Sequence, residues 1–286
     1  MKRIFPLFII LLALAACGRL ETIPYDPVQS PETWLQIQPY AEIRLGSFNF
    51  IFVQPSTSII VYLLGIMTIA VGLYFLKTVN GQRSRLWWGI ALLLWGIGAL
   101  LAGTSYEAFS YAIKCVGRDA CLWTSWWEIL YLVLSVWSID AMILAVAYSS
   151  VSGKLRKWLL VYAVVNAALY FLIVMIGVFT PVKFLISFEL LLIVTAPSII
   201  TFFVIHGWLY FRHKDTIALI YLGTWIWLGM TIVAYFLYLL SGNTTALWEK
   251  GIWFSENDVL HIGLIVWMVY IVRFLSPRVK DMIIAS

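Results

Sequence analysis

The sequence predicts an all-α polytopic membrane protein, with seven transmembrane helices and a short extracytoplasmic N-terminal segment. Apolar residues make up 63% of the 286 residues and charged residues only 12%, about half the share usual for a soluble domain. A chain of this length cannot bury that much apolar surface in one water-soluble core. Seven apolar runs, each long enough to cross a bilayer as a helix, account for the excess.

Residues 1–16 are predicted to be a lipoprotein-type signal peptide. Two positive residues precede an apolar stretch, 4–14, that is too short to span a bilayer. The stretch ends in Leu14-Ala15-Ala16-Cys17, which resembles the lipobox of bacterial lipoproteins. In that family the cysteine is acylated and becomes the mature N-terminus, so we expect lipidation at Cys17. The alternatives are an ordinary signal and an uncleaved anchor.

Residues 17–55 are predicted to form an extracytoplasmic cap on the outer face of the bundle. Five prolines prevent a long helix here. Apolar residues alternate in part over Phe48–Val53, which favours a strand pair. The segment is too short to be an independent domain.

Residues 56–276 are predicted to form the seven-helix bundle, followed by a cytoplasmic tail over 277–286. The apolar runs are 57–76, 86–109, 125–148, 157–179, 182–209, 216–240 and 257–275. Each run suffices for a helix, which satisfies its backbone polar groups within the segment.

Positive charges predict the orientation of the bundle. Lys and Arg are concentrated in alternate loops and after the last span, on the side to which the C-terminus belongs: Lys77, Arg83, Arg85, Lys154, Arg156, Lys157, Arg212, Lys214, Arg273, Arg278 and Lys280. The positive-inside rule then places the N-terminus outside and the C-terminus in the cytoplasm, which agrees with the lipobox. We expect a protein of the bacterial cytoplasmic (inner) membrane. Orientation explains the net charge of +5 better than binding to nucleic acid does.

Cys115 and Cys121 fall in the second loop, on the predicted outer side, where disulfides persist. A bridge between them would close a small loop between the second and third spans. Metal ligation is the alternative, but no second Cys/His pair completes such a site in the sequence. We therefore predict a disulfide.

Ionisable residues within the spans are candidates for function, because their burial in a membrane is costly. Those in the predicted outer half are Glu107, Glu128, Glu189, Glu256, Asp258 and His261. Acids at positions 128, 256 and 258 would also suit helix N-termini, which is the structural alternative. Asp258 and His261 share a helical face. Deeper in the bundle, Asp140 and Asn166 are expected to be hydrogen-bond partners between helices. His206 and His213 are expected at the cytoplasmic interface.

Two stretches resemble motifs of the alkaline-ceramidase superfamily. Residues 102–109 (AGTSYEAF) resemble its second helix, where a glycine and a serine precede a zinc-binding histidine. Residues 255–261 (SENDVLH) resemble its seventh helix, which carries two histidines four residues apart. The resemblance implies seven spans, a site near one face and hydrolysis of a sphingolipid amide.

Position by position, the resemblance makes His261 a metal ligand and Ser105 the counterpart of the serine. Glu128 would stand where the family has an aspartate. This sequence departs from the pattern at Asn257, which replaces the first histidine of the seventh helix, and in the second helix, where Glu107 is the titratable residue of the motif.

The leading functional prediction is a metal-dependent membrane hydrolase that cleaves a lipid amide or ester bond at the extracytoplasmic side. Glu107, Glu256, Asp258 and His261 would hold one zinc or other divalent metal, and Ser105 and Glu128 would act in catalysis. The alternative is a non-catalytic protein that binds a lipid or small molecule, or an accessory subunit with a protein partner in the cell envelope. Membrane lipids are partners under both hypotheses, and a transporter is a third.

Overall fold

A computed structural model describes residues 19–282, so the predicted signal and Cys17 lie outside the described residues. Seven helices within this range are long and apolar enough to cross a membrane, as predicted. They are α3 (Pro55–Lys77), α4 (Arg83–Ala102), α6 (Trp126–Ser149), α7 (Gly153–Phe179), α8 (Phe188–His213), α9 (Thr216–Leu240) and α11 (Glu256–Tyr270). Two π-helical segments, η1 (Gly103–Ala108) and η3 (Ile271–Leu275), extend α4 and α11.

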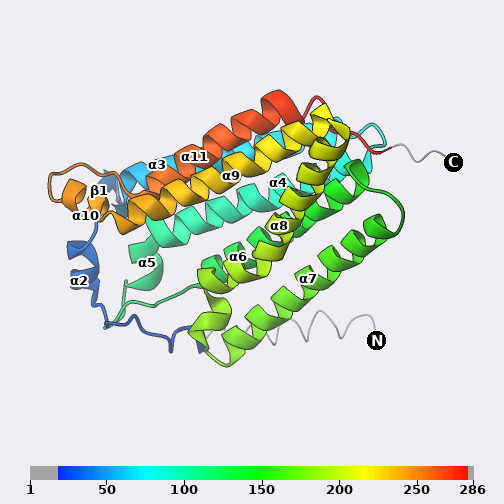
Figure 1. Ribbon diagram of the computed structural model, residues 1–286. Coiled ribbons are helices and arrows are strands. Elements are labelled where there is room, and N and C mark those ends of the chain that lie inside the picture. The colour runs from blue at the N-terminus through cyan, green and yellow to red at the C-terminus, as the bar shows by residue number, and fades with distance from the viewer. Residues whose placement is uncertain (1–18, 283–286) are drawn as a thin grey trace.

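Six of these helices form a ring, and the seventh packs outside it (Figure 1). Around the ring, α6 contacts α4, α4 contacts α3, and α3 contacts α11; the ring closes through α9 and α8 back to α6. Helix α7 packs against α6 on the outside of the ring. The ring arrangement leaves room for a central cavity between helices that are far apart in sequence.

Close packing of α3 on α4 depends on glycine. A Cβ atom at Gly65 would lie 3.1 Å from the Gly96 carbonyl oxygen, and one at Gly72 would lie 3.0 Å from that of Gly89. The two glycine pairs are seven residues apart on both helices, so they recur along one seam. Small residues let membrane helices approach closely, which increases packing contacts where no hydrophobic effect drives association.

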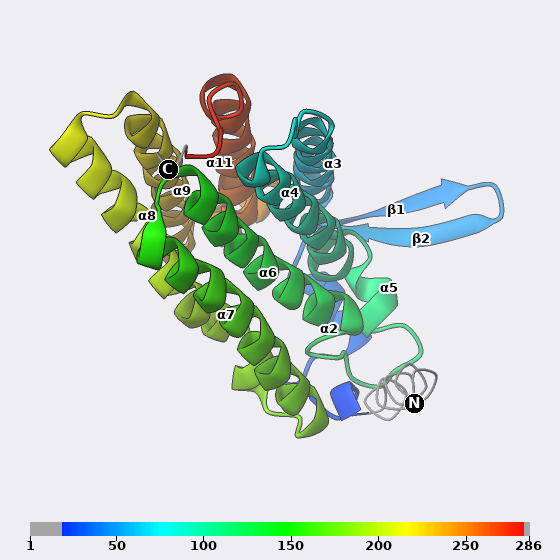
Figure 2. The ribbon, with the colours of Figure 1, turned by 90° about the vertical axis from the view of Figure 1, so that its right-hand side faces the viewer.

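Short elements gather at one end of the bundle, which we call the cap end. They are α2 (Pro31–Gln36), the strands β1 (Tyr40–Leu45) and β2 (Phe48–Val53), α5 (Ser110–Lys114), η2 (Lys183–Ile186) and α10 (Asn243–Trp248). The strands pair antiparallel, which confirms the predicted strand pair. The hairpin does not lie over the bundle as expected but projects sideways from it (Figure 2), and its strand β2 contacts η1 and α5.

Cys115 and Cys121 form a disulfide, as predicted. Both cysteines are buried and pack against Trp34 of α2. The N-terminal segment is joined to this loop by backbone hydrogen bonds from Cys121 to Gln29 and from Trp123 to Ile23. The disulfide loop therefore serves as the platform for the cap.

At the opposite end of the bundle, His206 is fully buried between helices. Its ring stacks on Tyr221 with centroids 4.4 Å apart, and its Nε2 lies 3.1 Å from Ser150 Oγ. Trp225 stacks on Phe202 beside it. The aromatic partners come from α8 and α9, which the α8–α9 hairpin brings together. His213, one residue before the hairpin, is exposed as expected.

Candidate functional site

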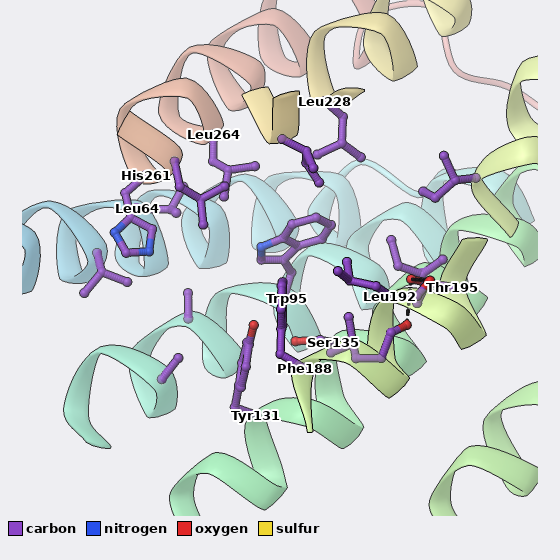
Figure 3. A pocket seen from close by; sticks show the side chains of 18 of the residues that line it. Leu64, Trp95, Tyr131, Ser135, Phe188, Leu192, Thr195, Leu228, His261 and Leu264 are labelled. Carbon is purple, nitrogen blue, oxygen red and sulfur yellow. Dashed lines mark hydrogen bonds between the residues drawn. The ribbon is translucent and has the colours of Figure 1, made fainter. Parts of the chain in front are cut away.

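The ring of six helices encloses an apolar cavity of about 390 Å³. All six helices contribute to its wall, each through the half nearer the cap end. The polar side chains in the wall are few. Tyr131 and Ser135, one turn apart on α6, direct their hydroxyls into the cavity, and the His261 imidazole reaches it from α11 on the opposite wall (Figure 3). Apolar walls with a few convergent polar groups are typical of binding sites for small molecules.

The cavity reaches the membrane-facing surface along α8. Phe188, Ala196 and Ile200 line the cavity and are also exposed at the surface, Ile200 by 61%. Helices α8 and α9 meet at the hairpin at Lys214 and diverge toward the cap end, as Figure 1 shows. A molecule dissolved in the bilayer could therefore enter sideways, without crossing water.

His261 is the predicted site residue that faces the cavity. Its side chain is only 9% exposed, and its Nδ1 atom has no hydrogen-bond partner among the described residues. A buried polar atom without a partner is costly, and in a native protein it frequently marks a site for a ligand or water. The position of His261, in the second turn of α11, places the imidazole at the cap-side end of the cavity.

Asp258 is held by a capping box rather than pointing freely toward His261. Its Oδ2 accepts hydrogen bonds from the Ser255 backbone N–H at 2.6 Å, the Ser255 hydroxyl at 3.0 Å and the Thr57 hydroxyl at 2.9 Å. These contacts satisfy the start of α11 and tie it to the start of α3. Glu256 accepts a hydrogen bond from Thr244, over 2.6 Å, and so joins α10 to α11. The structural alternative, a role at a helix N-terminus, accounts for the contacts of Asp258.

The side chains of Ser105 and Glu128 are in contact. The Ser105 hydroxyl donates to Glu128 Oε1 over 2.8 Å and lies 2.6 Å from Ser125 Oγ. The π-helical turn of η1 places Ser105 toward α6, where Glu128 begins the helix. Glu107, from the same turn, is 4% exposed, and its Oε2 has no hydrogen-bond partner within residues 19–282.

Lys114, between the second and third spans, is the buried partner of Glu128. The two side chains form an ion pair, and each is only 1% exposed. The ammonium also lies within 6 Å of the ring centroids of Tyr25, Trp34 and Tyr106, at 5.9, 5.8 and 5.0 Å. Aromatic faces attract a desolvated cation and compensate part of its lost hydration. Lys114, Glu128 and Ser105 thus join the cap to the second and third spans.

Burial by itself lowers the pKa of Lys114, but the charge of Glu128 and hydrogen bonds to Glu128 and Tyr25 outweigh it and raise the pKa above the usual 10.5. A raised pKa in the folded state means that the stabilisation is complete below the unfolded pKa and is lost as pH rises through the folded one. We expect the melting temperatures of wild type and of the double variant Lys114→Met/Glu128→Gln, which lacks both titrating side chains, to differ by a constant amount from about pH 6 to about pH 9. Thermal unfolding in detergent across this range tests this expectation. A difference in melting temperature that already shrinks as the pH rises from 6 to 9 would contradict it.

The predicted metal site is not assembled by these side chains. Among residues 19–282, no group of three or more His, Cys, Asp or Glu side chains is placed to hold a metal ion. Asp258 Oδ2 and one oxygen of Glu256 are engaged with hydroxyl and amide donors, whereas Asp258 Oδ1, Glu107 Oε2 and His261 Nδ1 have no hydrogen-bond partner among the described residues. The metal site stays a prediction.

Asp140 and Asn166 are hydrogen-bonded between α6 and α7, as expected, with Asn166 Nδ2 donating to Asp140 Oδ1 over 2.9 Å. Asp140 lines a second pocket, between α4, α6 and α7. Glu189 is exposed in the first turn of α8, so it needs no buried partner.

The fold defines a helical multi-pass membrane protein with an apolar cavity between its helices. The chain belongs to the family of unknown function DUF6962, whose model matches residues 56–276, the whole of the bundle. Neither the curated proteins nor the solved structures give a match.

Proposed function

We propose that this protein binds an apolar molecule from the membrane, such as a lipid with its acyl chain, inside the ring of helices. The observation that carries the proposal is the cavity that all six ring helices line, open to the membrane-facing side along α8. Its walls would bury an acyl chain, and His261, Tyr131 and Ser135 would hydrogen-bond a polar group at the end of that chain. This is the non-catalytic function considered from the sequence.

Photo-crosslinking tests this proposal. A fatty acid that carries a diazirine at mid-chain would be incorporated into vesicles with the protein and activated by light. We expect adducts concentrated on the cavity-lining peptides of α8 and α11, suppressed by excess unlabelled fatty acid. Adducts spread evenly over the lipid-facing helices, with no competition, would contradict the proposal.

His261 is expected to contribute to affinity for the polar end of the ligand. In His261→Leu, loss of one hydrogen bond worth about 1–1.5 kcal/mol should weaken binding of the fatty-acid probe roughly 5–12-fold. A hydrocarbon probe of the same chain length that lacks the carboxyl group should bind wild type and His261→Leu equally. If the hydrocarbon probe is weakened by His261→Leu as much as the fatty acid is, His261 acts only through packing.

Orientation and compartment form part of the proposal. The positive-inside rule and the lipobox-like motif support a bacterial cytoplasmic membrane, with the cap end outside. The disulfide at the cap end supports the same orientation, because disulfides persist outside the reducing cytoplasm. The cavity would then open in the half of the bilayer that faces away from the cytoplasm.

Hydrolysis of a lipid amide or ester is the second candidate function. The contact between Ser105 and Glu128, two residues of the ceramidase-like motifs, favours it. Both side chains are buried and, in the described part of the chain, lie outside the lining of the cavity. Elemental analysis of purified wild type and His261→Ala separates the two functions. About one metal per chain, lost in the variant, would support the hydrolase; equal and negligible metal in both would support binding.

A further inference from the structure

The hairpin of β1 and β2 has one apolar and one polar face. In the observed register Ala41 is opposite Phe52 and Ile43 is opposite Phe50, and alternation places Leu45 on the same side. Toward the turn, the other face carries Glu42 and Arg44, which form an exposed ion pair at 3.1 Å, and Asn49, which is opposite Arg44; toward the base, the same face carries Ile51 and the buried Val53. A two-stranded hairpin with an uncovered apolar face is marginally stable in water by itself.

The hairpin lies at the level where the bundle leaves the predicted membrane. Viewed along the bundle axis it extends sideways, and viewed from the side it is at the cap end (Figures 1 and 2). Val53 ends β2 and Pro55 begins α3, a helix whose 23 residues match the thickness of a bilayer core. The hairpin therefore runs along the boundary between hydrocarbon and headgroups rather than away from it.

The apolar face is turned toward the bundle and the membrane. Near the base, Phe50 and Phe52 contact Phe109, with ring centroids 5.6 and 6.3 Å apart. Phe109 directly follows Ala108, the last residue of the second span. Farther from the bundle the same face continues to Leu45, which is 64% exposed. The apolar face of the hairpin is thus continuous with the lipid-facing surface of the bundle.

We infer that this hairpin is a membrane-interface anchor: its apolar face rests on the acyl region of the lipids at the cap end, and its polar face points to water. The occupant is the bilayer itself, because the surface continues the lipid-facing surface of the helices at the same depth. Interfacial elements of this kind bury apolar side chains about 5–10 Å below the headgroups. Arg44, on the polar face, remains among the headgroups.

The test uses full-length protein in vesicles of phosphatidylcholine and phosphatidylglycerol. Leu45→Cys and Arg44→Cys are labelled separately with a nitroxide; the two positions are adjacent in the strand but on opposite faces. Unsubstituted protein treated with the label is the background control. Collisions with oxygen, which concentrates in lipid, and with a water-soluble nickel chelate are measured by electron paramagnetic resonance. The pair Ile43→Cys and Asn49→Cys repeats the comparison if either first variant is poorly folded.

We expect the label at position 45 to collide with oxygen several times more often than with nickel, and the label at 44 to show the reverse. Equal access of nickel to both labels would place the hairpin in water and overturn the inference. Exclusion of both reagents from position 45 would mean that a protein, not lipid, covers the face, which would overturn it as well.

Discussion

Replacing Lys114 with methionine is expected to lower the free energy of unfolding by about 3–5 kcal/mol, the largest effect we expect of a single substitution. The variant leaves the Glu128 carboxylate buried without its counter-charge, and Ser105 and Ser125 alone do not compensate a buried negative charge. The cap should loosen with it, since Lys114 also contacts Tyr25 and Trp34. Denaturation of detergent-solubilised protein, followed by circular dichroism, measures the change.

Two controls make the Lys114 result specific. Lys154→Met, at an exposed position, should change stability by no more than about 0.5 kcal/mol. Adding Glu128→Gln to Lys114→Met removes both charges but keeps an acceptor for Ser105, so the double variant should be more stable than Lys114→Met alone. If the double variant is the less stable of the two, the ion pair is not what holds this cluster together.

Filling the cavity is expected to weaken ligand binding strongly, with little effect on the fold. In Ala99→Phe the new ring would occupy space that the proposed ligand needs. Displacing three to four buried methylene groups costs about 2–3 kcal/mol, or roughly 30–150-fold in Kd. Titration of reconstituted protein with a fluorescent fatty acid measures this change.

The matched control for the cavity is Ala168→Phe, which introduces the same side chain into the second pocket, between α6 and α7. It should bind the fatty acid like wild type. Should Ala99→Phe fail to fold, Ala102→Leu fills the same cavity with a smaller group. Equal affinity in all variants would mean that the fatty acid does not bind in this cavity.

Hydropathy alone was sufficient to predict the seven helices, because a membrane span must be apolar over its whole length and must satisfy its backbone internally. Short-range chemistry was sufficient for the disulfide, and the Asp140–Asn166 contact followed from the cost of leaving either residue unpaired. The helix boundaries differ from the predicted spans by a few residues, mostly where polar caps begin a helix.

The contacts between helices could not be predicted in this way. No sequence pattern pointed to Lys114, which lies between spans, because only the folded cap brings Glu128 and three aromatic rings around it. The stacking of His206 on Tyr221 depends on the fold in the same way. The cavity depends on how six helices close into a ring, which periodicity within one helix does not encode.

Native mass spectrometry of the intact protein released from detergent micelles is the most direct test of the central claim that the ring binds an apolar molecule. Binding predicts one lipid-sized adduct per wild-type chain that survives mild activation, persists in Ala168→Phe and is absent from Ala99→Phe. Wild type that appears only at the mass of the bare chain, with a spectrum like that of Ala99→Phe, would contradict it.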